Sequence, residues 1–234
     1  MKTLPKWQRD EMKFPGVDFA DLAEVDMHQQ IQARDVAEFE AIIKRIGLAP
    51  EHTLIDLGAG GGEFAVHAAK HCRCVWAVDA SPAMLDCARA RARQEGVDNI
   101  KFVHAGFLTY EHADEPVDVV VSHTALHHLP DMWKGIALAR VAAMLADHGR
   151  LHLRDLAFRF DPADYVAAFE SFLEMVETHL GSEIIPGAEA TLRDEFPTWD
   201  WVWEGLLRRA GFRIDLADYR AGLAEYLCTK EVKT

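Results

Sequence analysis

The chain has 234 residues, half of them hydrophobic, and a formal net charge of −13 from 38 acidic and 25 basic side chains. This length and composition fit one α/β domain with a small elaboration and a sizeable core. The negative charge repels nucleic-acid phosphate and anionic lipid, and no basic run offsets it locally, so we expect neither as a partner. No apolar run reaches the roughly 18 residues of a membrane span.

The cysteines favour a reducing compartment. Two of the four, Cys72 and Cys74, are too close in sequence for an ordinary disulfide. We expect all four to be reduced and mostly buried, and the protein to be cytoplasmic. The first 10 residues also lack the hydrophobic core of a signal peptide. A catalytic or metal-binding Cys-x-Cys pair is the alternative.

The N-terminal region, residues 1–48, is predicted to be an arm followed by a cover helix. Residues 1–16 are polar and interrupted by proline and glycine, which is typical of irregular structure. Apolar residues then recur at helical spacing as far as Ile46, and Gly47 predicts the end of that helix.

Strands and helices alternate through residues 49–158, which predicts a doubly wound, mostly parallel sheet. Ser81 and Pro82 suit a helix start, because serine caps well and proline is tolerated at the first helical position. We expect strands near 52–57, 73–79, 100–105, 117–122 and 149–156, and helices near 62–71, 82–95 and 132–146.

The alternation breaks after the fifth strand. Residues 159–198 are predicted to be a helical insertion, with a helix ending near Leu180 and a loop over 181–187. We expect it to cover the ligand cleft together with the N-terminal helix, because open α/β sheets bind ligands at the carboxyl ends of their strands. Residues 199–234 are predicted to form a last helix, ended by Gly211, and an antiparallel β pair.

The most informative stretch begins at Thr53 and reads Thr-Leu-Ile-Asp-Leu-Gly-Ala-Gly-Gly-Gly. It predicts a strand, a tight glycine turn and a helix N-terminus, where the backbone takes positive φ and a ligand approaches it closely. Glu63 stands where the dinucleotide fingerprint requires glycine. An acid, Asp79, ends the next predicted strand, where its carboxylate can accept from ribose hydroxyls.

Four segments, 54–62, 77–85, 118–131 and 206–212, resemble class I S-adenosylmethionine (SAM) methyltransferases of the ubiquinone/menaquinone-biosynthesis type. The similarity covers residues 50–158 well and 199–230 loosely. It implies a seven-stranded sheet whose last strand is antiparallel, and methyl transfer from SAM to a small-molecule acceptor.

SAM needs close backbone at its amino-acid end, a carboxylate for its ribose and an apolar slot for adenine. The residues predicted to provide them are Asp56, Gly58, Ala59, Gly60, Asp79, Ala80, Met84, Gly106, Phe107 and Ser122. For Ala80, Met84 and Phe107, ordinary core packing is an equal alternative. The family often has Gly-Asp-Ala where this chain has Ala-Gly-Phe at 105–107, so the carboxylate for the adenine amino group is missing. Adenine recognition then depends on stacking or on a different acid.

We predict His123 and Asp155 as catalytic residues at the ends of the fourth and fifth strands. A neutral imidazole suits a general base at His123, and a strand-end acid at Asp155 is expected to face the same cleft. His127 and His128 follow closely. The alternatives for these histidines are a metal cluster or a packing loop. Since adjacent side chains are expected to point apart, we expect no metal.

The acceptor is expected to contact His127 and four residues outside the core motifs: His28, Arg193, Trp199 and Trp203. Trp199 and Trp203 share one face of the predicted last helix, where core packing is the alternative to an aromatic pocket. Arg193 and Glu195 precede that helix in a predicted loop, where surface charge is the alternative.

These patterns predict a SAM-dependent methyltransferase of a small molecule, monomeric or homodimeric. The rivals are a SAM-binding protein without transfer activity, a nicotinamide oxidoreductase, and a protein or nucleic-acid methyltransferase, of which the acidic charge disfavours the nucleic-acid enzyme. A base is needed only when the attacking atom of the acceptor carries a proton. The sequence therefore leaves O-, N-, S- and C-methylation open.

Overall fold

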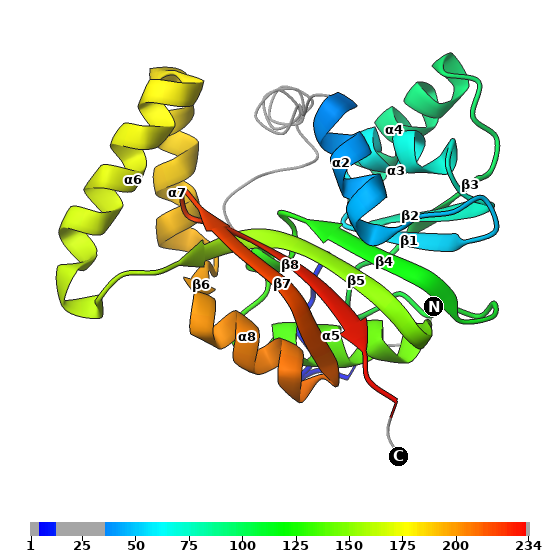
Figure 1. Cartoon of the computed structure of the whole chain (residues 1–234). Coiled ribbons are helices and arrows are strands. Elements are labelled where there is room, and N and C mark those ends of the chain that lie inside the picture. The colour runs from blue at the N-terminus through cyan, green and yellow to red at the C-terminus, as the bar shows by residue number, and fades with distance from the viewer. Residues whose placement is uncertain (1–4, 13–35, 233–234) are drawn as a thin grey trace.

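The computed structural model describes residues 5–12 and 36–232 and shows a sheet with helices on both faces (Figure 1). The strand order is β3-β2-β1-β4-β5-β8-β7, and β6 pairs with β5 outside this path. The bounds are β1 Thr53–Leu57, β2 Cys74–Asp79, β3 Ile100–His104, β4 Val117–His123, β5 Leu145–Phe158, β6 Thr198–Trp199, β7 Phe212–Arg220 and β8 Leu223–Lys230. The predicted doubly wound, seven-stranded sheet is confirmed.

The strands β1 to β5 pair in parallel, whereas β8 runs antiparallel to both β5 and β7. All five residues of β1 are buried, as expected for a central strand covered on both faces. The order reverses at β1, which lies between β2 and β4. Open α/β sheets bind ligands at such a reversal, outside the carboxyl ends of the strands.

Successive strand residues face opposite sides of the sheet, so two cores form. Leu54 packs in the core with α2 (Val36–Ile46) and α3 (Glu63–Ala69), and α4 (Pro82–Gln94) lies beside α3. Ile55 packs in the other core, against α5 (Asp131–Met144) and α8 (Asp200–Arg209). Ser81 caps α4 as predicted, since its Oγ accepts from the backbone N–H of Met84 at 3.2 Å.

The insertion after β5 differs in part from the prediction. Two short 3₁₀ helices, η2 (Pro162–Asp164) and η3 (Ser182–Ile184), precede the helices α6 (Tyr165–Leu180) and α7 (Ile185–Asp194). The predicted loop over 181–187 is wrong from Ser182 onward. Proline in the first turn of α7 does not break the helix, because that position needs no N–H donor. The pair α6–α7 stands beyond the carboxyl end of β5 (Figure 1).

The fifth strand is longer than predicted at both ends. It begins at Leu145, before a register shift against β4, and His148 adopts a left-handed conformation with φ 62° inside the irregularity. It continues to Phe158, so Asp155 is an interior residue of the strand. No helix among the described residues is long and apolar enough to cross a bilayer.

Candidate functional site

The glycine turn after β1 has one position that faces open space. Gly58, Gly60 and Gly62 all have positive φ, at 76°, 52° and 79°. A Cβ on Gly58 would lie 2.4 Å from Cβ of Ala125, and one on Gly62 would lie 2.7 Å from Cβ of Ala88. On Gly60 it would meet no described atom within 4 Å. Packing therefore requires glycine at 58 and 62, whereas Gly60 leaves room for a ligand.

The Asp79 carboxylate holds this turn in place. Its Oδ2 accepts from the backbone N–H of Gly60 and its Oδ1 from that of Ser81, both at 2.8 Å. Burial raises the pKa of Asp79, and these two hydrogen bonds partly offset that effect. Each carboxylate oxygen has a second lone pair, so the group that fixes the turn retains acceptor capacity toward a ligand.

The other predicted cofactor residues lie around this turn. Phe107 packs against it, with its Cζ 3.7 Å from the position of a Cβ on Gly58. Ala80 lies next to Asp79, and its carbonyl is 2.9 Å from Nε2 of His104. The buried members of this group are Asp56, Ala59, Met84, Gly106, Phe107 and Ser122. The Oγ of Ser122 has no hydrogen-bond partner within the described part of the chain.

A carboxylate that the sequence analysis did not predict lies beside Gly106. It belongs to Glu11, and its atoms lie 2.4–2.8 Å from the position of a Cβ on Gly106. Its two oxygens accept from the backbone N–H of Leu108 at 2.9 Å, and Oε1 also accepts from Oγ1 of Thr109 at 2.8 Å. Burial raises the pKa of Glu11 above its ordinary value. The Glu11 carboxylate, from a segment distant in sequence, thus lies beside the position at 105–107 where the family often has an aspartate and this chain has none.

His123 begins a buried hydrogen-bonded chain on the α2 face of the sheet. Its Nε2 lies 2.9 Å from Nδ1 of His152, and Nε2 of His152 lies 2.8 Å from Oε1 of Glu225. Since a carboxylate only accepts, His152 donates from Nε2 and accepts at Nδ1 from Nε2–H of His123. In the neutral chain, Nδ1 of His123 then carries the lone pair of a base. Glu225 is further paired with Arg45.

The Asp155 side chain lies on the opposite face, because consecutive strand residues alternate. It is fully buried, with Oδ2 accepting from the backbone N–H of Leu126 and Oδ1 lying 2.7 Å from Nδ1 of His127. The expectation that Asp155 and His123 face one cleft is therefore wrong. Asp155 fixes the orientation of His127 instead.

His127 and His128 lie in the 3₁₀ helix η1 (Leu126–His128), with ring centroids 4.3 Å apart. The expectation that they point apart is wrong, because a helical turn does not alternate its side chains as a strand does. Both rings approach Glu195, at 3.3 Å and 3.4 Å. Burial alone lowers the pKa of His127, but the Asp155 and Glu195 carboxylates together outweigh it and raise that pKa. Burial and the adjacent His127 lower the pKa of His128.

The remaining residues predicted to contact substrate do not gather at one place. His28 lies outside the described residues. Arg193 is exposed at the end of α7 and pairs with Asp194 at 2.7 Å. Trp203 is fully buried in the core, where its indole N–H donates to the carbonyl of Leu156 at 2.9 Å. Trp199 precedes α8 in β6, so the two tryptophans do not share a helix face.

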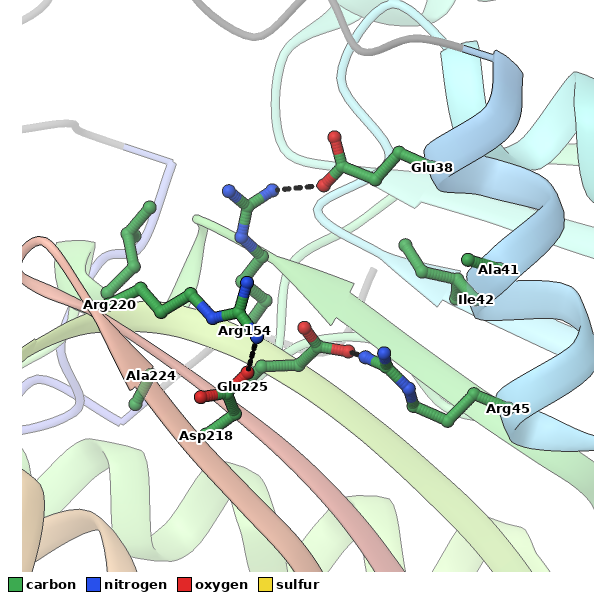
Figure 2. A pocket seen from close by; sticks show the side chains of 10 residues that line it. Glu38, Ala41, Ile42, Arg45, Arg154, Asp218, Arg220, Ala224 and Glu225 are labelled. Carbon is green, nitrogen blue, oxygen red and sulfur yellow. Dashed lines mark hydrogen bonds and ion pairs between the residues drawn. The ribbon is translucent and has the colours of Figure 1, made fainter.

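A cavity of about 280 Å³ lies between α2, β5 and the β7–β8 pair, beside the histidine chain. Figure 2 shows charged side chains converging on it from these elements. Arg154 pairs with Glu38 at 3.0 Å, and Arg220 pairs with Asp218 at 2.8 Å. A more apolar cavity of about 430 Å³ adjoins it across Arg220 and Leu223, and its lining includes Phe158, Phe160, Phe172, Met175 and Tyr219.

Comparison with known proteins identifies the class of enzyme to which this domain belongs. Residues 54–149, which hold the glycine turn, Asp79 and His123, match the family model of the methyltransferase domain. The chain carries a methyltransferase domain. It is a methyltransferase, and SAM is its cofactor.

Curated relatives agree with this assignment. An uncharacterized methyltransferase of Geobacillus sp. (strain WCH70) is 27% identical over 79% of this chain and 81% of its own. The uncharacterized methyltransferase YcgJ of Bacillus subtilis is 31% identical over 52% of this chain and 47% of its own.

Solved structures show the same fold. The crystal structure of YcgJ matches with a TM-score of 0.65 at 16% identity, over 85% of this chain and all of that one. Magnesium protoporphyrin IX methyltransferase of Synechocystis PCC 6803 with bound S-adenosylhomocysteine (SAH) matches with a TM-score of 0.61 at 14% identity, over 90% of this chain and 88% of that one.

Replacing Gly60 by valine is expected to abolish SAH binding while leaving a folded protein, because the side chain fills the open space above the turn. Gly96→Val is the matched control, since Gly96 also has positive φ, 68°, and open space around it. Circular dichroism and calorimetry with SAH compare them. Normal SAH affinity in folded Gly60→Val would exclude this turn from the cofactor site.

Proposed function

We propose that the protein transfers the methyl group of SAM to a small acceptor that carries a charged group. The observation that supports it most directly is the open space at Gly60, next to the Asp79 carboxylate and at the reversal of strand order. When bound, SAM would supply a methyl group on a positively charged sulfur, and the sulfur would leave as SAH when an acceptor atom attacks the methyl carbon in line. The protein then needs mainly to align the acceptor and exclude water.

In this proposal three groups hold SAM. The backbone at Gly60 receives its amino-acid end, Asp79 accepts from the ribose hydroxyls, and Glu11 accepts from the adenine amino group. Glu11 replaces a carboxylate that the 105–107 segment lacks, and its position beside Gly106 supports this role. Apolar contact with the adenine ring is proposed for Phe107 and Met84, which are 8% and 3% exposed.

The polar cavity is proposed as the acceptor site. Its volume, about 280 Å³, suits a small molecule and not a folded protein surface. Its arginines and carboxylates favour a charged acceptor, and the adjoining apolar cavity provides space for a nonpolar portion. The ubiquinone/menaquinone subfamily, a cytoplasmic location and a monomeric or homodimeric state stay predictions.

His123 is proposed as the general base for an acceptor whose attacking atom is protonated. The His152–Glu225 pair orients its ring and stabilises the imidazolium that forms, because Glu225 balances the positive charge through His152. The proton therefore stays on the buried chain during transfer and reaches solvent afterwards.

Glu11→Gln is expected to weaken SAH binding by about tenfold, since a hydrogen bond to a charged acceptor contributes roughly 1.5–3 kcal/mol. S-inosylhomocysteine, which has an oxygen in place of the adenine amino group, separates recognition from folding. Calorimetry should show that wild type prefers SAH and that Glu11→Gln loses this preference. An unchanged preference in the variant would mean that Glu11 only anchors the chain near Leu108.

A screen of small charged acceptors with wild type is expected to release SAH above the background rate. With the best acceptor, His123→Ala should lower kcat about 10²–10⁴-fold at saturating SAM, with SAM affinity nearly intact. The exposed His179→Ala is the control. A rise in acceptor KM alone would indicate that His123 positions the acceptor and is not the base.

No acceptor-dependent SAH release, together with normal SAM binding, would favour the rival SAM-binding protein without transfer activity. Retention of both wild-type kcat and wild-type pH dependence in His123→Ala would exclude a general base at this position.

A further inference from the structure

We propose that His127, His128 and Glu195 form a buried zinc-binding site that keeps one coordination position open. The three ligand atoms lie within 4.8 Å of one another. They come from η1 and from the segment between α7 and β6, which the backbone N–H of Phe196 ties to the carbonyl of His127 at 2.8 Å. Its three ligands belong neither to the glycine turn nor to the His123 chain.

The separations within the cluster fit metal ligands better than hydrogen bonds. Nε2 of His127 lies 3.3 Å from Oε2 of Glu195, and Nδ1 of His128 lies 3.4 Å from Oε1. A charge-assisted hydrogen bond brings such atoms to about 2.7–2.9 Å. Zinc bonds of about 2.0–2.1 Å place two tetrahedral ligands about 3.3–3.4 Å apart.

Burial makes the present arrangement costly without a further partner. The Glu195 side chain is 2% exposed and that of His127 is 6% exposed. Oε2 of Glu195 has no hydrogen-bond partner among residues 5–12 and 36–232, although it is fully enclosed. A buried carboxylate oxygen without a donor is unfavourable, and a cation at this point satisfies it.

The surroundings of His127 are those of a metal-bound histidine. Its other nitrogen, Nδ1, lies 2.7 Å from Oδ1 of Asp155. Oδ2 of Asp155 is itself fixed by the backbone N–H of Leu126 at 2.8 Å. A carboxylate on the far nitrogen holds the ring so that Nε2 faces the metal, and such partners are typical of zinc sites. Asp155 is thus a positioning residue for this site.

The ligand chemistry favours a transition-metal ion such as zinc over a hard cation. Two imidazoles and a carboxylate suit Zn²⁺, whereas Mg²⁺ and Ca²⁺ prefer oxygen ligands alone. Three protein ligands with one further position is the arrangement of zinc sites that bind water or substrate. A dication also balances the two carboxylates, Asp155 and Glu195, that converge on His127.

A second cluster on the surface provides an internal comparison. Glu40, His67 and His71 offer the same ligand set, but the Glu40 side chain is 50% exposed. There Oε1 of Glu40 lies 2.9 Å from Nε2 of His67, an ordinary hydrogen-bond distance, and 3.3 Å from Nε2 of His71, so exposure is what distinguishes the two clusters. The double variant His67→Ala/His71→Ala therefore removes the competing surface ligands and leaves the buried cluster intact.

The test measures metal binding in that double variant, after chelator treatment. Zn²⁺ is titrated against a chromophoric chelator, and Co²⁺ is used as a spectroscopic probe of four-coordinate geometry. We expect one equivalent of Zn²⁺ and tetrahedral Co²⁺ absorption. Adding His128→Ala or Glu195→Gln should remove both signals, and Asp155→Asn should weaken Zn²⁺ affinity by about 10–100-fold.

Circular dichroism and thermal unfolding with and without Zn²⁺ show whether each variant folds. Zn²⁺ should raise the Tm of the double variant, because an ion that binds the native state stabilises it. It should leave the Tm of the Glu195→Gln derivative unchanged, because that derivative is expected not to bind Zn²⁺. Absence of stoichiometric Zn²⁺ binding in the double variant would overturn the proposal. So would Zn²⁺ binding that is unaffected by His128→Ala and Glu195→Gln.

Discussion

The arrangement of the proposed SAM site, at the carboxyl ends of β1 and β2, depends on one buried carboxylate. Asp79 ends β2, yet its oxygens accept from the glycine turn after β1 and from the first residue before α4. The ends of β1 and β2 are therefore joined by hydrogen bonds between backbone N–H groups and the Asp79 side chain, in addition to the hydrogen bonds of the sheet. Burial disfavours the charged form, but backbone N–H groups of two different loops stabilise it. The geometry of Gly60, and hence the space above it, follows from this link.

The carboxyl edge of β4 and β5 places two histidine systems on opposite faces of the sheet. His152 and Asp155 lie on the same strand, but their side chains point to opposite faces of the sheet. His152 therefore contacts His123, and Asp155 contacts His127. Between these systems Thr124 has φ 49°, which is rare for a β-branched residue and costs about 1–3 kcal/mol. Its backbone N–H bonds to the carbonyl of Arg154. The strained turn thus separates the proposed base from the proposed zinc site.

Local signals predicted much of the fold. The glycine turn, the serine cap at Ser81 and the helix end at Gly47 each depend on neighbours in sequence, and all three are confirmed. The start of α7 was missed because proline reads as a breaker, although it is harmless in a first turn.

The residues missed at the site depend on distant contacts. Glu11 lies 97 residues from Leu108, and Glu225 lies 73 residues from His152. No spacing rule joins such pairs. His152 did offer a signal, as a histidine between leucines of a predicted buried strand. The pairing of His127 with His128 was misjudged because their conformation was assumed to be extended.

The most direct test of this account is SAH affinity in Asp79→Ala, measured by calorimetry beside the exposed Asp86→Ala. The account predicts at least a tenfold loss in Asp79→Ala, because the variant loses both the ribose acceptor and the anchor of the glycine turn. Asp86→Ala should bind as wild type does. Unchanged SAH affinity in a folded Asp79→Ala protein would contradict the placement of the cofactor at this edge of the sheet.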